Sequence, residues 1–320
     1  MSEAVCVVGA GAWGTALAVH LGRAGQAVRL WARDPAPLRA ARASPHLPGV
    51  TLPETVEVVD APEEGTVVLL AVPMQHLRAV TSGLPPGGAL VACCKGVERA
   101  TGSLPLEVLA QVQPGRPAAI LTGPTFAHEV VAGLPTAAVV AAEGAGLRER
   151  VAALLGGPAF RLYGNADPLG AQIGGAAKNV IAIAAGCVSG AGLGENARAA
   201  LVTRGVAELS RLVASLGGRA ETAAGLSGLG DLLLTCTGRA SRNLRLGEAL
   251  AQGLPLAQAL ASLGGVAEGA ATASALLTRA TQGERRVDLP ICTAVAALLD
   301  GRLGVAEAVA ALLARPRRDE

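Results

Sequence analysis

Charged residues are scarce in this sequence of 320 residues. Only 16% are Asp, Glu, Lys or Arg, and the formal net charge at pH 7 is +2. Because the arginines are spread along the whole length, the sequence lacks the concentrated positive charge that nucleic-acid binding requires. Apolar residues make up 51% of the chain, but many are alanine, and no unbroken apolar run reaches about 20 residues. We therefore expect neither a nucleic-acid partner nor a membrane-spanning helix.

Signals for export and for metal binding are also missing. No basic segment followed by an apolar core stands at the N-terminus, and Glu3 leads directly into the first expected strand. The cysteines form no C-x-x-C pair, and the histidines have no partner at a metal-binding spacing. We expect a cytoplasmic protein without a metal site. We also expect six buried free thiols, at Cys6, Cys93, Cys94, Cys187, Cys236 and Cys292.

Lysine is almost absent. Of the 27 basic residues, 25 are arginine and only Lys95 and Lys178 are lysine. Lys178 lies in the middle of 170–186, GAQIGGAAKNVIAIAAG, which otherwise has the composition of a buried helix. Burial favours the neutral form of a lysine amine, whereas arginine stays protonated in proteins. Lys178 is therefore predicted to give or take a proton; the alternative is a lysine that survives by chance and extends its amine to the surface.

The first half of the sequence alternates short apolar runs with helical stretches. This pattern is typical of an α/β domain with a doubly wound, mostly parallel sheet. The expected buried strands are residues 4–8, 27–32, 66–72, 89–93, 118–122, 136–142 and 160–163.

Beyond the last of these strands the pattern becomes helical. Asp167 is expected to cap a helix whose first residue is Pro168. The domain boundary is placed between an α/β domain, 1–164, and a C-terminal all-helical domain, 165–320. The expected helices cover 168–188, 196–216, 244–252, 255–263, 268–281 and 289–299.

A glycine-rich turn follows the first expected strand. Gly9, Gly11 and Gly14 have the G-x-G-x-x-G spacing, and a second strand follows at 27–32. In this setting the glycines permit a tight turn, a close approach of the backbone to a pyrophosphate, and packing of helix on strand. The N-terminus of the helix then faces the anion. We therefore expect residues 1–164 to be a Rossmann domain that binds a dinucleotide.

The end of the second strand bears on the choice of dinucleotide. A Rossmann domain that prefers NAD usually places an acid there to hold the ribose hydroxyls. This sequence has Arg33, followed by Asp34. An arginine suits a 2′-phosphate, so NADPH is expected to bind well, and Asp34 would keep NADH usable. The alternative is that Arg33 is a solvated charge at the end of the strand.

Two further segments have the residues to hold an anion. Ser241, Arg242 and Asn243 begin a helix, so backbone N–H groups and a guanidinium converge there. Gly123 and Thr125 lie where a strand ends and a helix opens. Ser241 as a helix cap is compatible with this role, because capping and phosphate binding use the same donors.

Two residues are candidates to assist Lys178. Asp231 follows Gly228 and Gly230, and it either caps the helical segment after it or pairs with Lys178 and holds the ammonium on a carbonyl oxygen. Asn179, next to Lys178 on the same helix, would orient the lysine or donate to a substrate; otherwise it is structural.

The ordered set of motifs resembles one known family. It consists of GAGAWGTALA, LWARD, CKGVE, LTGPTFAHEV, AAKNVIAIAAG, GLSGLGDLLLTCTGRASRN and GVAEGAAT. Together they are similar to the bacterial NAD(P)-dependent glycerol-3-phosphate dehydrogenases, from residue 4 to beyond residue 290. The resemblance implies a Rossmann domain followed by a helical substrate-binding domain, usually in a homodimer. It also implies interconversion of dihydroxyacetone phosphate and sn-glycerol 3-phosphate, which supplies phospholipid synthesis.

The resemblance also assigns residues. It implies a catalytic set of Lys178, Asp231, Lys95 and Asn179. It implies substrate contacts from Lys95, Gly123, Thr125, Asp231, Ser241, Arg242 and Asn243. It implies contacts to NAD or NADP from Gly9, Gly11, Ala12, Trp13, Gly14, Arg33, Lys95, Ala127, Arg242, Val266 and Glu268. Two departures from the pattern are Ala12, where Ser or Thr is common, and Cys94, where a smaller or hydroxyl residue is expected.

Other functions remain open at this point. Related hydroxyacid dehydrogenases separate the catalytic Lys and Asn by four residues, whereas Lys178 and Asn179 are adjacent. A 3-hydroxyacyl-CoA dehydrogenase would need a separated His–Glu dyad, which the sequence does not place. A non-enzymatic dinucleotide sensor explains the glycine loop but leaves the segment around Lys178 and the helix start at Ser241 without a purpose.

Overall fold

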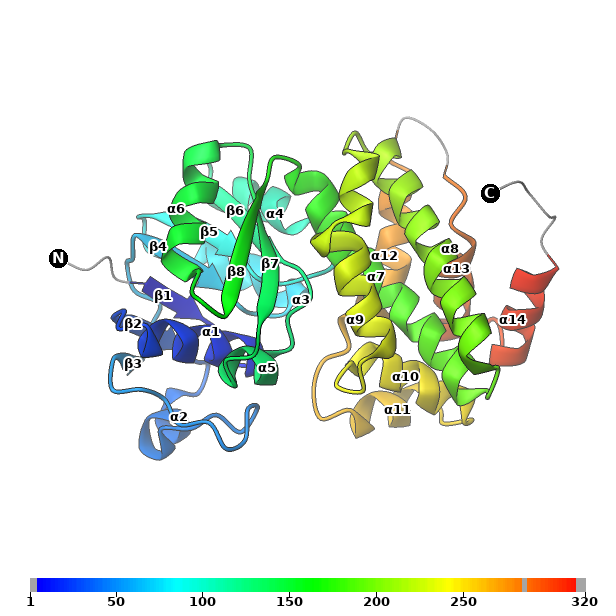
Figure 1. Ribbon diagram of the computed structural model, residues 1–320, viewed down its shortest axis with the longest axis horizontal. Coiled ribbons are helices and arrows are strands. Elements are labelled where there is room, and N and C mark those ends of the chain that lie inside the picture. The colour runs from blue at the N-terminus through cyan, green and yellow to red at the C-terminus, as the bar shows by residue number, and fades with distance from the viewer. Residues whose placement is uncertain (1–4, 284–286, 315–320) are drawn as a thin grey trace. The chain divides into compact units, whose positions relative to one another are not determined.

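The computed structural model describes residues 5–283 and 287–314, which form two compact units (Figure 1). The first unit comprises Met1–Lys95 and Leu104–Ala171, and the second comprises Gly96–Ser103 and Gln172–Glu320. Between these units the chain passes after Lys95, after Ser103 and after Ala171.

A mostly parallel sheet forms the first unit. Its strand order is β3-β2-β1-β4-β5-β6-β7-β8. All neighbouring strands pair in parallel except β6 and β7, which are antiparallel. This confirms the doubly wound α/β fold, and the order reverses between β1 and β4, where ligands of such sheets bind. The strands are β1 Val5–Val8, β2 Val28–Trp31, β3 Val56–Val59, β4 Val67–Leu70, β5 Ala89–Ala92, β6 Ala118–Thr122, β7 Thr136–Ala141 and β8 Phe160–Asn165.

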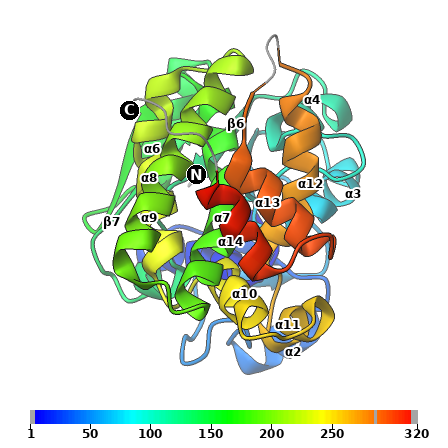
Figure 2. The same ribbon diagram turned by 90° about the vertical axis from the view of Figure 1, so that its right-hand side faces the viewer.

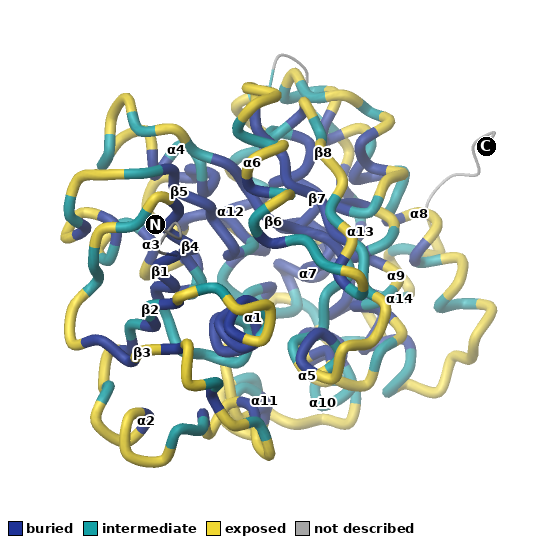
Figure 3. Tube along the Cα trace, turned by 60° about the vertical axis from the view of Figure 1, so that its left-hand side comes forward, coloured by how far each residue is buried: buried dark blue, intermediate teal, exposed yellow. Residues whose placement is uncertain are grey.

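The central strands are buried on both faces. Every residue of β1, β4 and β5 is buried, as expected of a parallel strand covered by helices on either side. In Figure 3 the region around β4 and β5 is dark blue, whereas α2 is mostly exposed. Helix α1 packs on α5, and α3 packs on α4. The helices are α1 Ala12–Arg23, α2 Pro35–Ala41, α3 Met74–Ser82, α4 Pro105–Val112, α5 Ala127–Val131 and α6 Ala145–Leu155.

The edge strand β3 is the one strand that the sequence did not predict. It has only four residues, and the side chain of Glu57 is exposed between buried valines. Val56 pairs in register with Val28 of β2. A run of only four residues is a weak signal by itself, because its stability comes from the neighbouring strand.

The described part of the second unit is helical, as predicted. Helix α14 was not predicted, and α9 covers the short helical segment that was expected only after Asp231. A 3₁₀ turn at Ala220–Ala224 and a π-helical turn at Leu226–Gly230 precede α9. The helices are α7 Pro168–Gly190, α8 Gly194–Ser215, α9 Asp231–Thr237, α10 Arg242–Ala251, α11 Leu256–Ser262, α12 Glu268–Ala280, α13 Pro290–Leu299 and α14 Val305–Leu313.

Helix α7 is the core of the second unit. Asp167 caps it as predicted, because its Oδ1 accepts the N–H of Gly170 at 2.9 Å. A Cβ atom at Gly174 would overlap the carbonyl oxygen of Ser227, and one at Gly186 would overlap that of Leu244. The glycines are thus needed for close packing of backbones. By length and composition α7 could cross a membrane, but 89% of its apolar window is buried, which is typical of a core helix.

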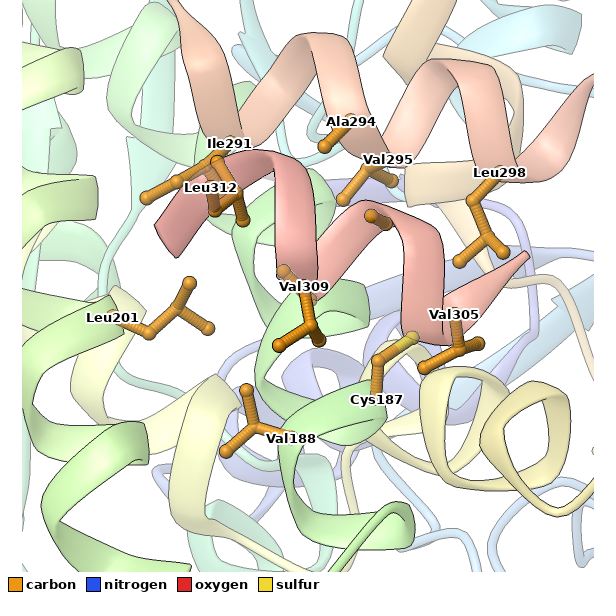
Figure 4. A pocket seen from close by; sticks show the side chains of 12 residues that line it. Cys187, Val188, Leu201, Ile291, Ala294, Val295, Leu298, Val305, Val309 and Leu312 are labelled. Atoms are coloured by element: carbon orange, nitrogen blue, oxygen red, sulfur yellow. The ribbon is translucent and has the colours of Figure 1, made fainter. Parts of the chain in front are cut away.

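A small apolar cavity lies between α7, α8, α13 and α14. Figure 2 shows α13 and α14 side by side, and Figure 4 shows the aliphatic side chains around the cavity. Its volume is about 30 Å³, and none of the predicted site residues lines it. Leu298, Val305 and Leu312, which line it, are only partly buried, so this apolar pocket is partly open at the surface. It holds none of the polar groups that the predicted chemistry needs.

Candidate functional site

Each glycine of the loop in the first unit is needed for a different structural reason. Gly9 has φ +109°, and a Cβ atom there would lie 2.8 Å from the carbonyl oxygen of Ala71. A Cβ atom at Gly14 would overlap the carbonyl oxygen of Gly9, so helix and strand could not approach as they do. A Cβ atom at Gly11 would meet nothing within 4 Å. Open space over Gly11 is what a pyrophosphate approaching the backbone needs.

The backbone around this loop fits a dinucleotide. Gly11 is the N-cap of α1, so Ala12, Trp13 and Gly14 form its first turn. The first N–H groups of a helix have no intrahelical partner and carry the positive end of the helix dipole. The loop follows β1 at the point where the strand order reverses. Ala127, the first residue of α5, is partly buried and packs against the hydrophobic core of this unit.

Arg33 is available for a ligand. It is exposed just after β2, and within the described ranges it has no hydrogen-bond or ion-pair partner. Its neighbour Asp34 is the N-cap of α2, but its side chain makes no capping hydrogen bond. Arg39 is different, because its guanidinium donates to Asp60 at 2.8 Å and to the carbonyl oxygen of Val58. Of these two arginines, only Arg33 is unengaged.

Three predicted substrate residues come together in the first unit. Lys95 follows β5, and its Nζ donates to the carbonyl oxygen of Gly123 at 3.0 Å. Thr125 Oγ1 donates to the same oxygen at 3.3 Å. Gly123 has φ +135°, and a Cβ atom there would lie 3.0 Å from the Cα atom of Ala138. Both the backbone conformation and the lack of space therefore disfavour a side chain at this position. The cluster stands at the carboxyl ends of β5 and β6.

The second unit holds a buried ion pair. Lys178 Nζ lies 2.8 Å from Asp231 Oδ1, and the two side chains are only 9% and 1% exposed. The contact that the sequence predicted between these residues is therefore present. The alternative, a lysine that reaches the surface, is wrong, and so is the reading of Asp231 as a helix cap. Gly230 is the N-cap of α9, and Asp231 is its first residue.

Thr235 completes this cluster and was not predicted from the sequence. Lys178 Nζ donates to Thr235 Oγ1 at 2.9 Å. Thr235 Oγ1 in turn donates to the backbone carbonyl of Asp231 at 2.6 Å. The signal was present, since Thr235 follows Asp231 by one helical turn and shares its face. The π-helical turn just before Asp231 is a feature that often marks functional sites.

Asn179 has other partners than the expected one. Its Oδ1 accepts from Asn243 Nδ2 at 2.8 Å, and its Nδ2 donates to the carbonyl oxygen of Gly175. Asn243 Oδ1 accepts the N–H of Gly269 at 3.0 Å. Within the described residues Asn179 has no hydrogen bond to Lys178, so the expectation that it orients the lysine is wrong. Adjacent helical residues point about 100° apart, and here they point to different helices.

The segment that starts α10 holds the residues predicted to bind an anion. Ser241 caps the helix, because its Oγ accepts the N–H of Leu244 at 3.2 Å. Arg242 is the first helical residue and is exposed. Val266 is 51% exposed, and Glu268 is the first residue of α12. All four belong to the second unit.

The cysteines are free and buried, as predicted. Burial raises the pKa of Cys93, Cys187 and Cys236 to about 12, so these thiols stay protonated and are poor nucleophiles. Among the described residues, no group of three His, Cys, Asp or Glu side chains is placed to hold a metal ion.

The chain is similar to known proteins along nearly its whole length. Two family models match the chain, the N-terminus of NAD-dependent glycerol-3-phosphate dehydrogenase over residues 4–147 and its C-terminus over residues 167–310. A glycerol-3-phosphate dehydrogenase [NAD(P)+] of Gluconobacter oxydans is 52% identical over 317 residues, covering 98% of this chain and 97% of its own. The enzyme of that name from Acidiphilium cryptum is 54% identical over 319 residues, with the same coverage.

A solved structure is similar along the whole chain. The crystal structure of glycerol-3-phosphate dehydrogenase from Coxiella burnetii has a TM-score of 0.93 and 35% sequence identity. The match covers 98% of this chain and 99% of that one. With both family models matched and relatives more than half identical over nearly full length, the chain belongs to the NAD-dependent glycerol-3-phosphate dehydrogenase family.

Proposed function

We propose that the protein catalyses the reversible, NAD(P)H-dependent reduction of dihydroxyacetone phosphate to sn-glycerol 3-phosphate, with Lys178 as the proton donor. The observation that carries this proposal is the buried contact of Lys178 with Asp231 and Thr235. Reduction of a ketone needs a hydride, a proton for the developing alkoxide and a means of holding the substrate. The bound nicotinamide supplies the hydride, and this chain's residues supply the rest.

The partners of Lys178 fix its protonation and its direction. The carboxylate of Asp231 keeps the buried ammonium charged, because it compensates the desolvation of the positive charge. Thr235 has a single hydroxyl proton, which it donates to the backbone of Asp231. Its oxygen therefore accepts from Lys178 and restricts the amine to one orientation. A positioned general acid of this kind contributes roughly 10²–10⁴ in rate.

The substrate phosphate is held at the start of α10. Arg242 supplies a charged guanidinium fork, and the capped helix end supplies N–H groups and a favourable dipole. Ser241 and Asn243 belong to the same turn, and the resemblance adds Lys95, Gly123 and Thr125 from the first unit. Asn243 uses its oxygen and one N–H within the protein. It retains one further N–H for the substrate.

Both NADP and NAD serve as cofactors in this proposal. Gly9, Gly11 and Gly14, with Ala12 and Trp13 in the first turn of α1, would hold the pyrophosphate of the dinucleotide. Arg33 would bind the 2′-phosphate of NADPH, and Asp34 would keep NADH usable. The resemblance adds cofactor contacts from Lys95, Ala127, Arg242, Val266 and Glu268. We further propose a cytoplasmic homodimer, without a metal, that supplies glycerol 3-phosphate for phospholipid synthesis.

A substrate comparison tests the proposal. NADPH oxidation is followed with dihydroxyacetone phosphate, with unphosphorylated dihydroxyacetone and with a series of 2-oxo acids. We expect rapid oxidation with dihydroxyacetone phosphate alone. Preference for a 2-oxo acid would indicate a different hydroxyacid dehydrogenase, and cofactor binding without turnover of any substrate would indicate a dinucleotide sensor.

A further inference from the structure

The backbone at Gly265 lies directly beneath the side chain of Arg242. A Cβ atom at Gly265 would overlap Nη1 of Arg242 and lie 3.5 Å from its Cδ and Cζ atoms. These three atoms are the nearest that the Cβ atom would meet, so a side chain at 265 would displace Arg242 from the position it now has. The φ angle of Gly265 is outside the left-handed region. The backbone conformation itself would therefore accept another residue, and the overlap with Arg242 is the conflict that a side chain would create.

Arg242 needs such a support. Its side chain is exposed, and within the described part of the chain its guanidinium has no hydrogen-bond or ion-pair partner. A long exposed arginine that is held by nothing loses about 2 kcal/mol of side-chain entropy when a ligand fixes it. Contact along Cδ, Cζ and Nη1 restricts the side chain before the ligand arrives, which reduces that cost. The neighbouring Gly264 does not share this role, because it has φ +65° and a Cβ atom there would meet nothing within 4 Å.

We propose that Gly265 is a positioning residue for the recognition of the substrate phosphate. The peptide at Gly265 is the surface on which the guanidinium of Arg242 lies, and the absence of a side chain sets where its N–H groups point. The proposal rests on the assignment of Arg242 to the phosphate in the proposed function. It adds a second residue, on the loop before α12, that determines how well the phosphate is bound.

The substitution Gly265→Ala separates this role from a structural one. The atom in the way is the end of a flexible side chain rather than backbone, so the protein relieves the overlap by moving Arg242. We expect an unfolding midpoint close to that of the wild type, together with a KM for dihydroxyacetone phosphate raised by roughly tenfold or more, the range for a charged hydrogen bond. Competitive inhibition by inorganic phosphate should weaken by a similar factor.

Two kinds of variant serve as controls. Gly146→Ala makes the same chemical change where a Cβ atom meets nothing within 4 Å, and it should leave KM unchanged. Arg242→Ala alone and combined with Gly265→Ala completes a double-mutant cycle. If Gly265 acts through Arg242, the alanine at 265 raises KM in the wild-type background and adds nothing once Arg242 is gone.

The outcomes distinguish the two proposals. If Arg242→Ala leaves KM and phosphate inhibition unchanged, the phosphate role of Arg242 is wrong and the role of Gly265 falls with it. If Arg242→Ala raises KM but Gly265→Ala does not, the inference about Gly265 alone is overturned. It is also overturned if Gly265→Ala causes the same loss in both backgrounds, because the glycine would then act through another group.

Discussion

Replacing Asp231 by asparagine should show how much free energy it costs to bury the charged amine of Lys178 without its partner. Asp231→Asn keeps the shape of the side chain and an oxygen that accepts from Lys178, but it removes the negative charge 2.8 Å from Nζ. Breaking a buried ion pair in this way costs about 3–5 kcal/mol. The loss of unfolding free energy has an upper limit, because Lys178 can become neutral by releasing its proton rather than stay buried as an unpaired charge. With an ordinary lysine pKa of about 10.4, that release costs about 5 kcal/mol at pH 7 and about 2 kcal/mol at pH 9.

Because this upper limit falls with rising pH, the stability that Asp231→Asn loses relative to the wild type should also depend on pH. The folded variant binds fewer protons than the unfolded chain over this range, so its stability rises with pH relative to the wild type. Urea unfolding of both proteins at pH 7, 8 and 9 measures the difference, in which the titration of other groups cancels. We expect a deficit of several kcal/mol at pH 7 that shrinks toward about 2 kcal/mol at pH 9.

A double variant controls for packing. In Lys178→Met with Asp231→Asn no buried charge remains, so most of the stability should return and the dependence of the deficit on pH should vanish. A deficit of Asp231→Asn that is below about 1 kcal/mol, or that does not change between pH 7 and pH 9, would refute the reasoning.

Two further predictions concern groups away from the ion pair. Arg33→Ala should raise the KM for NADPH more than the KM for NADH; equal losses would count against a contact with the 2′-phosphate. Burial raises the pKa of Glu208 from 4.5 to about 7, against the opposing effects of the N–H groups of Ile291 and Cys292 and of nearby Arg211. Because the folded pKa is the higher one, this group stabilises the protein below about pH 4.5, and the contribution is lost as the pH rises through 7. In Glu208→Gln the fall in unfolding free energy between pH 5 and pH 8 should be smaller than in the wild type, and an unchanged slope would show that another group titrates.

Much of the fold follows from local patterns in the sequence. The valine-rich runs and the glycine loop predict the parallel sheet, and the capping of α7 by Asp167 sets where its helix begins. Strand β3 could not be predicted in this way, since its four residues are ordered by pairing with β2. The passage of Gly96–Ser103 into the second unit likewise depends on packing between segments far apart in the sequence.

The site was predicted less completely than the fold. A lysine in an apolar helix needs a counter-charge, so its pairing with Asp231 could be anticipated from chemistry and resemblance. Thr235 was missed although it stands one turn after Asp231. Asn179 contacts Asn243 rather than Lys178, because adjacent positions on a helix face different neighbours, and its contact with a substrate stays a prediction. The contact of Gly265 with Arg242 could not be predicted from the sequence, because it depends on how the start of α10 packs beside the loop before α12.

The most direct test of the account is the turnover number of three proteins with NADPH and saturating dihydroxyacetone phosphate. These are the wild type, Lys178→Ala and Lys178→Arg. We predict that Lys178→Ala lowers kcat by roughly 10²–10⁴, as expected for loss of a general acid. Lys178→Arg should recover little of this, because it restores the charge without a proton that can be transferred. A folded Lys178→Ala protein with nearly unchanged kcat, or an arginine variant as active as the wild type, would contradict the assignment of Lys178 as the proton donor.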